Sequence, residues 1–221
     1  MPMIPRLFAV LSALVLAACD PIAQVPASPP AVVGTRAVMQ YHRQELYSEI
    51  TGVTGKVVTT EVFYQGRQVA EFGAYRGLYI VNRREPNFQV ELDFDESALE
   101  ALFPLQVGKE VSFSGNTKRL DRGTSYNFWS NVQVVGEKTM KLASGDRQVF
   151  VVDILTETEG DGRTMRKTQT VYFDPELSMI LKSVLHEDGY KNYWFVVKVE
   201  KPSEGKGQAT QPQLRSSTVI I

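Results

Sequence analysis

The chain has 221 residues and carries 24 lysines and arginines against 25 aspartates and glutamates, for a formal net charge of −1 at pH 7. This length suits one domain and is marginal for two. The nearly balanced charge argues against a basic nucleic-acid-binding surface, so we expect no nucleic acid among its partners.

A short apolar run opens the chain. It covers residues 7–16, follows Arg6, and ends in Leu16-Ala17-Ala18-Cys19. Its length of about ten residues is typical of a signal-peptide core and about half that of a membrane-spanning helix. The segment resembles the signal and lipobox of bacterial lipoproteins, which implies removal of residues 1–18 and lipidation of Cys19. The resemblance also implies a cell-envelope protein that faces the periplasm and is attached to a membrane through its lipid.

Cys19 is the only cysteine in the chain. Disulfides need pairs, so we expect none in the mature domain, and lipidation accounts for the single thiol. The alternative is an ordinary secretory signal with a cysteine nearby by chance. Asp20 resembles the inner-membrane retention signal of enteric lipoproteins, which favours the inner membrane over the outer membrane.

Two polar or proline-rich segments flank the predicted domain. Residues 20–34 contain four prolines, which disfavour a hydrogen-bonded ladder and bias the chain to polyproline II. We therefore predict lipid attachment and a tether at 19–34. Residues 202–221 are rich in Ser, Gly, Gln and Thr, which predicts a disordered tail. A single β-rich domain remains at 35–201.

The predicted domain consists mostly of strands. Residues 35–47 are ambiguous, and we expect one or two helical turns around Val38, Tyr41 and Leu46. Beyond them, apolar, β-branched and aromatic runs alternate with glycine-containing turns, as strands and hairpins do. The predicted strands cover residues 46–53, 56–65, 69–72, 78–81, 88–92, 111–115, 126–135, 148–158, 164–173, 179–186 and 190–201.

One short helix is predicted at 95–103. Asp95 is a suitable N-cap, and Pro104 ends the helix. Leu99 and Leu102 fall on one face, which we expect to cover one end or face of the sheet. Consecutive hairpins indicate an antiparallel meander. The expected fold is therefore mainly β (α+β), a curved meander sheet or half-barrel with one covering helix.

Two further runs resemble segments that recur in β-rich envelope proteins of unassigned function. They are the Pro-Leu-x-Val-Gly-Lys run within 102–109 and the aromatic-x-x-Pro-Glu-Leu run within 172–182. Their physical interpretation is a helix-to-strand connection in the first and a turn nucleated by Asp174-Pro175 in the second. The resemblance bears on architecture and implies no activity.

The chain offers few residues for catalysis or metal binding. Zinc sites draw three or four ligands from His, Cys and carboxylates, and here there are two histidines, His42 and His186. No G-x-S-x-G motif occurs. We therefore expect no cofactor, no metal and no catalytic residue. A Ser–His–Asp arrangement built from distant segments keeps a hydrolase open as an alternative.

Two tryptophans are the candidate binding residues. Neighbouring residues of a strand point to opposite faces, so Trp129 and Phe128 separate, as does Trp194 from its neighbours. Counting in twos places Tyr193 and Phe195 in the core and Trp194 on the other face. The rings left on that face, Trp129 and Trp194, form an apolar groove for an acyl chain or a peptide, or else they pack half-buried beneath another segment.

The expected function is therefore a non-catalytic binding role in a lipid-anchored envelope protein, with a partner protein or an apolar ligand. Two alternatives remain at this point. One is an envelope hydrolase that acts on peptidoglycan, a glycan or an ester. The other is an accessory subunit of an envelope complex that has no ligand.

Replacing Cys19 with serine should abolish lipid attachment, because a serine hydroxyl cannot form the thioether. Metabolic labelling with a fatty-acid analogue, followed by detergent partitioning, measures the effect. Incorporation of the label into Cys19→Ser would show that the lipobox assignment is wrong.

Overall fold

A computed structural model describes residues 26–160, 162–187 and 189–202. The predictions for the signal peptide, for Cys19 and for the tail after residue 202 lie outside the described residues. Within them the chain forms twelve strands and one helix: β1 (Arg36–Tyr41), β2 (Gln44–Thr54), β3 (Val57–Tyr64), β4 (Arg67–Tyr75), β5 (Tyr79–Glu85), β6 (Phe88–Phe94), α1 (Glu96–Glu100), β7 (Glu110–Arg119), β8 (Thr124–Leu142), β9 (Gly145–Gly160), β10 (Arg163–Asp174), β11 (Met179–Glu187) and β12 (Tyr190–Glu200).

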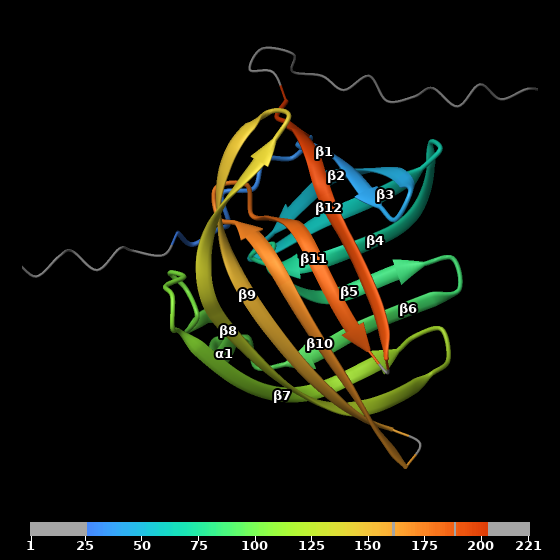
Figure 1. Cartoon of the computed structure of the whole chain (residues 1–221). Helices are drawn as coiled ribbons and strands as arrows, with labels where there is room; N and C mark the ends of the chain where they lie inside the picture. Colours follow the sequence, from blue (N-terminus) through green and yellow to red (C-terminus); the bar gives the residue numbers. More distant parts are fainter. Residues whose placement is uncertain (1–25, 161, 188, 203–221) are drawn as a thin grey trace, which may run out of the picture.

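The strands form one closed antiparallel barrel (Figure 1). Each strand pairs with the next one in the sequence, and β1 pairs with both β2 and β12. The prediction of a mainly β antiparallel meander with one short helix is confirmed. The expectation of an open sheet or half-barrel is wrong, because the first and last strands join.

The difference comes from the opening segment. We expected one or two helical turns within residues 35–47. The structure instead has strand β1 and its turn into β2 there. Ala37 and Met39 alternate inward and are buried. The strand is only six residues long and has little β-branched character, so its local signal is weak. Pairing on both sides decides its conformation, since strand formation depends strongly on context.

Helix α1 confirms the predicted N-cap and is shorter than expected. Asp95 accepts a hydrogen bond from the backbone nitrogen of Ser97, and the helix ends at Glu100. Leu99 and Leu102 are fully buried in the larger hydrophobic cluster. No helix within the described residues is long and apolar enough to cross a membrane.

The segment that contains α1 closes one end of the barrel, which we call the capped end. Fifteen residues, 95–109, join β6 to β7. The carboxylate of Glu100 accepts hydrogen bonds from the Tyr75 hydroxyl (2.6 Å) and from Nε and Nη2 of Arg76 (2.9 and 2.6 Å). Nζ of Lys56 lies 3.3 Å from the same carboxylate. These contacts fasten α1 to the β4–β5 turn.

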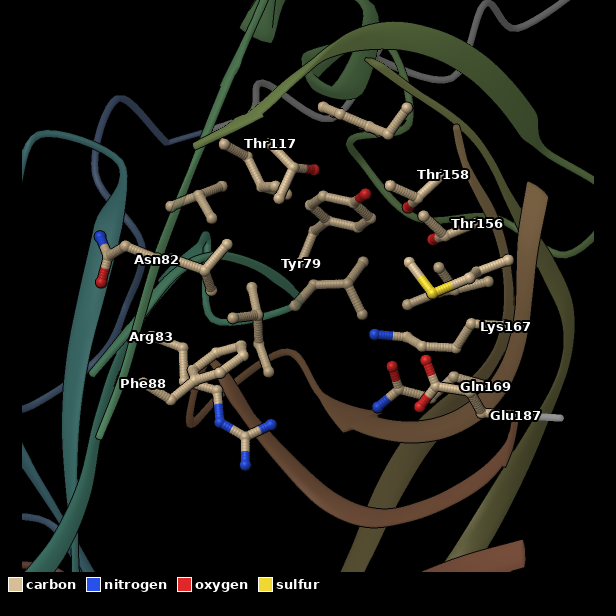
Figure 2. Close-up of a pocket in the computed structure, with 18 of the residues that line it drawn as sticks. Tyr79, Asn82, Arg83, Phe88, Thr117, Thr156, Thr158, Lys167, Gln169 and Glu187 are labelled. Atoms are coloured by element: carbon tan, nitrogen blue, oxygen red, sulfur yellow. The ribbon is translucent and has the colours of Figure 1, made fainter. Parts of the chain in front are cut away.

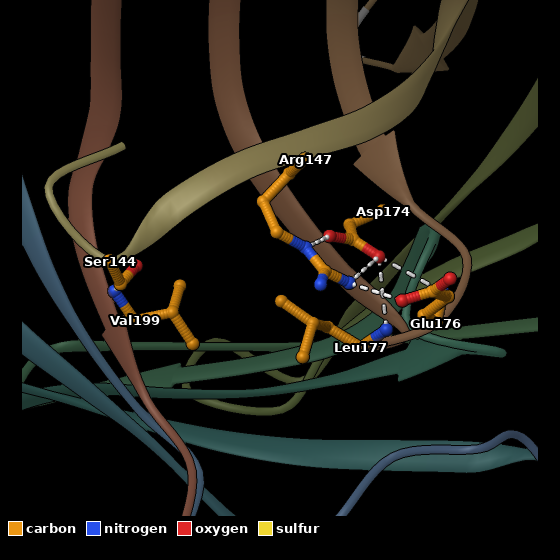
Figure 3. Close-up of polar contacts among 6 residues, drawn as sticks. All are labelled: Ser144, Arg147, Asp174, Glu176, Leu177 and Val199. Atoms are coloured by element: carbon orange, nitrogen blue, oxygen red, sulfur yellow. Dashed lines mark hydrogen bonds and ion pairs between the residues drawn. The ribbon is translucent and has the colours of Figure 1, made fainter. Parts of the chain in front are cut away.

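A second polar cluster lies at the turn between β10 and β11 (Figure 3). The buried Asp174 carboxylate accepts hydrogen bonds from the backbone nitrogens of Glu176 (2.9 Å) and Leu177 (3.1 Å). Nε of Arg147, on β9, donates to the same carboxylate at 2.6 Å. The predicted turn at Asp174-Pro175 is confirmed, and the cluster ties it to the neighbouring hairpin.

The opposite end carries only short connections, and we call it the open end. Its turns contain two to four residues each, and they join β1 to β2, β3 to β4, β5 to β6, β7 to β8, β9 to β10 and β11 to β12. Turns of this length cannot fold across a twelve-stranded barrel. The single long connection, 95–109, at one end and the short turns at the other therefore give the barrel a covered base and an uncovered opening.

Both ends of the described chain lie at the capped end. Arg36 pairs with Glu200, so the first and last strands begin and finish side by side. The backbone nitrogen of Gly34 donates to the carbonyl of Ile50 at 2.8 Å, and Pro29 is buried. Among the described residues, packing against the barrel thus starts at Pro29, within the segment expected to be a tether.

The Glu100 cluster predicts how stability depends on pH. Hydrogen bonds from Arg76 lower the pKa of the Glu100 carboxyl from 4.5 to about 2. A carboxyl whose pKa is lower in the folded state stabilises that state above its unfolded pKa, and this stabilisation is lost as the pH falls toward the folded value. We therefore expect the free energy of unfolding to decline between about pH 5 and pH 2.

Glu100→Gln should remove part of that decline and lower the free energy of unfolding at pH 7 by about 1–3 kcal/mol, because it leaves the guanidinium of Arg76 without its partner. The side chain of Arg76 is 5% exposed. Denaturant unfolding at a series of pH values measures both effects. The exposed Glu137, replaced in the same way, is the matched control, and equal pH profiles for the two variants would contradict the assignment.

Candidate functional site

The interior of the barrel contains two adjacent hollows. The larger cavity, of about 460 Å³, is bounded by β1–β5 and β10–β12. The smaller cavity, of about 220 Å³, is bounded by β5–β11 (Figure 2). The two hollows are adjacent, because residues on β5, β10 and β11 line both of them: Ile80, Arg83, Lys167, Gln169 and Ile180.

The larger cavity is long and mostly apolar. Its wall follows β11 from Met179 to Leu185, which at about 3.3 Å per residue is roughly 20 Å of strand. Val62, Phe72 and Trp194 are among its apolar wall residues. Its volume lies within the range of about 300–1,000 Å³ that is typical of small-molecule sites.

Trp194 faces this cavity, so the prediction that it lies on the face opposite the core is wrong. Trp194 lines the larger cavity and Val196 is 2% exposed, whereas Tyr193 is 41% exposed. Tyr193 and Phe195, which we expected in the core, therefore lie on the outward face of β12.

A β-bulge in β12 explains the error. Val38 pairs with Lys198 and Met39 with Val196, so Val197 is an extra residue without a partner on β1. An extra residue reverses which residues of a strand point inward. The inward Val199 lies beyond the bulge, and counting in twos from it assigns the wrong face to Trp194.

A polar group lies beside Trp194 on the cavity wall. Nδ2 of Asn192 donates a hydrogen bond to the Tyr41 hydroxyl at 3.2 Å. The other amide atom, Oδ1 of Asn192, is buried and has no hydrogen-bond donor among the described residues. Buried acceptors nearly always have a partner, so this wall can accept a hydrogen bond from a bound molecule. Neither Asn192 nor Tyr41 was predicted from the sequence to be a site residue.

The structure does not bring the two tryptophans together. Phe128 is buried and lines the smaller cavity, and Trp129 is 39% exposed. Trp129 therefore lies on the outer face of the barrel wall, and Trp194 on the inner face. Of the two residues assigned to a candidate groove, Trp194 alone lines a cavity.

Charged residues lie where the interior meets the open end. Lys167 on β10 and Arg83 on β5 line both cavities, and Figure 2 shows them on facing walls. Glu187 lies directly across the ladder from Lys167. Burial lowers the pKa of Lys167, and the nearby carboxylate of Glu187 partly opposes this effect.

The sequence contains a signal that Lys167 points inward. Val171 and Phe173 are the most apolar residues of β10, and they are buried. Counting back from them in twos reaches Gln169 and then Lys167. A lysine on the core face of a strand is rare unless it is paired, and this alone marks it for attention.

The residues considered for catalysis and metal binding lie away from the cavities. His42 is in the β1–β2 turn, where its ring packs against Tyr41 and Tyr193. His186 is exposed on β11. Neither histidine lines a cavity. Among the residues that the structure describes, no group of three or more His, Cys, Asp or Glu could hold a metal ion.

No protein-family model and no curated protein matches the chain. Solved structures do match. The hypothetical lipoprotein YmcC from Escherichia coli K12 has a TM-score of 0.51 and 11% identity, over 78% of this chain and 87% of that one. The likeness to YmcC shows a shared fold.

Two further structures match at lower scores. A protein from Bacteroides fragilis NCTC 9343, described as exported and as having a YmcC-like fold, has a TM-score of 0.44 and 10% identity, over 78% of this chain and 98% of that one. A protein from Parabacteroides distasonis ATCC 8503, described as a lipoprotein, has a TM-score of 0.44 and 8% identity, over 80% of this chain and 100% of that one.

The opposite placement of the two tryptophans can be measured with single-tryptophan variants. Trp129→Phe leaves Trp194, which should emit at shorter wavelength and be quenched weakly by iodide, because its ring faces the interior. Trp194→Phe leaves Trp129, which should emit at longer wavelength and be quenched strongly. Equal quenching of the two variants would contradict the inward orientation of Trp194.

Proposed function

We propose that this protein is a lipid-anchored protein of the bacterial cell envelope that binds an apolar ligand inside its barrel. The larger cavity carries the proposal, because a hollow of about 460 Å³ with a mostly apolar wall lies next to an uncovered end of the barrel. An apolar molecule that moves from water into this cavity gains about 25 cal/mol of binding free energy per Å² of apolar surface that it buries.

The rigidity of the wall supports binding by a preformed site. Every strand of the barrel is paired on both sides, so the cavity does not need to be assembled when a ligand enters. Preformed sites lose less conformational entropy on binding than sites that must become ordered. A closed sheet therefore favours an apolar ligand in the interior over a partner strand added at a sheet edge.

The envelope location rests on the N-terminal motif that ends at Cys19. The shared fold with YmcC, which is described as a hypothetical lipoprotein, is consistent with it. We propose that the domain faces the periplasm, with Asp20 favouring retention at the inner membrane. Two or three acyl chains, as bacterial lipoproteins usually carry, give stable attachment, whereas one chain binds a bilayer only marginally.

We propose binding and not catalysis as the role of the cavity. The two histidines do not line it. Ser183 accepts a hydrogen bond from Nε2 of Gln169 at 2.9 Å. A general base within reach of a nucleophilic hydroxyl is the signature of a hydrolase site. The mostly apolar wall of the larger cavity suits binding of a ligand instead.

A neutral apolar dye tests the binding role. N-phenyl-1-naphthylamine should gain fluorescence with residues 19–221 produced without lipid, which include every described residue. Ala70→Phe should weaken this binding at least tenfold, because Ala70 lines the larger cavity opposite Val62 and the added ring occupies the space.

Ser114→Phe is the matched control, since Ser114 is exposed and lies across the ladder from Trp129 on the outer face. It should bind the dye as the unmodified chain does. Equal dye binding by all three proteins would place the dye outside the cavity and overturn the proposed function.

A further inference from the structure

Lys167 is an interior cation that packing does not explain. Its side chain points into the barrel and lines both cavities (Figure 2), on the face of β10 that carries the buried Val171 and Phe173. Moving an ammonium group out of water is costly unless a counter-charge or hydrogen-bond acceptor meets it. A threonine or valine would fill the same position without that cost.

The strand register places Lys167 at the open end. It lies across the ladder from Glu187, the last residue of β11. Arg83 lies two residues before the end of β5 at Glu85. The cations therefore lie at the rim, and the apolar wall of the larger cavity extends from them toward the capped end.

The groups that face Lys167 leave its charge largely unmatched. Nε of Arg83 donates to the carboxylate of Glu85 at 2.8 Å, and the positive charge of Arg83 still lowers the pKa of Lys167. Glu187 is near enough to raise the pKa of Lys167, against the lowering caused by burial. Among the described residues, however, no carboxylate oxygen lies within 4.0 Å of Nζ of Lys167, so Lys167 forms no ion pair with them. Gln169 is its neutral neighbour on the same face of β10.

We propose, on the basis of the binding function proposed above, that the ligand is a single-chain amphiphile with an anionic head group. Its aliphatic chain fills the larger cavity, and its carboxylate or phosphate binds Nζ of Lys167 at the open end. Lys167 is then the residue that determines specificity for the head group.

Charge and shape support each part of this assignment. An anion beside Nζ stabilises the charged ammonium, which burial in the barrel destabilises. A charge-assisted hydrogen bond to an oxyanion is also among the stronger polar contacts in proteins. The wall that runs roughly 20 Å along β11 suits an extended chain. A volume of about 460 Å³, in the lower half of the usual range for ligand sites, favours one chain over two.

The experiment compares three probes of equal chain length: dodecanoate, dodecyl phosphate and dodecanol. The protein is residues 19–221 without lipid, freed of copurified lipid and carrying Trp129→Phe, so that the emission of Trp194 reports directly from the cavity wall. We expect both anions to bind more tightly than the alcohol. Lys167→Met should weaken binding of the anions about tenfold or more and leave the alcohol unchanged.

Two further variants keep the result interpretable. Lys167→Gln, which retains a polar side chain without the charge, should behave like Lys167→Met. Lys191→Met removes an exposed lysine of β12 and should leave all three affinities unchanged. Whichever anion binds more tightly identifies the head group as a carboxylate or a phosphate.

The outcomes separate this inference from the function beneath it. Equal binding of the alcohol and the anions, or an anion preference that persists in both Lys167 variants, overturns the assignment of the head group and leaves apolar binding intact. Failure of all three probes to change the emission of Trp194 overturns the binding function itself.

Discussion

The hydrogen-bonded ladder between β1 and β12 is the interaction on which the rest of the structure depends. It joins the first strand to the last and leaves no sheet edge exposed, which closure alone achieves. Closure also fixes the number of strands at twelve. Eight strands give an interior that side chains just fill, so a barrel of twelve must either contain space or be filled from outside. Here α1 and its flanking loop fill one end, and the cavities occupy the remainder.

The sequence predicted the later strands and the helix well because their local signals are strong. Hairpin turns with glycine, alternating aromatic residues and the Asp95 cap act over a few residues, and tertiary context agrees with them. Closure of the sheet was missed because it depends on β1, a short strand whose residues have little intrinsic preference. Its conformation comes from two partners, one of them more than 150 positions later in the chain, and no local pattern contains that information.

The site was predictable only in part, and again the reason is physical. Trp194 was selected as a binding residue from a count that assumed an uninterrupted strand, but the bulge at Val197 reverses the inward face of β12. The inward direction of Lys167 could have been deduced from Val171 and Phe173, because β10 itself contains no extra residue between them; the bulge in the β10–β11 ladder places its extra residue, Leu181, on β11. The cavity itself could not have been deduced, since its volume depends on strand number and on what closes the ends.

The position of the chain ends has a consequence for how such a barrel can work. Both leave from the capped end, so the lipid anchor proposed at Cys19 would hold the barrel at its base and leave the opening unobstructed. With such an anchor, a change in the number of residues between Cys19 and Pro29 would alter how far the opening lies from the membrane without altering any wall residue. The distance of the opening from the membrane and the specificity for a ligand could thus evolve independently. The first would change through residues before Pro29, and the second through wall residues such as Lys167.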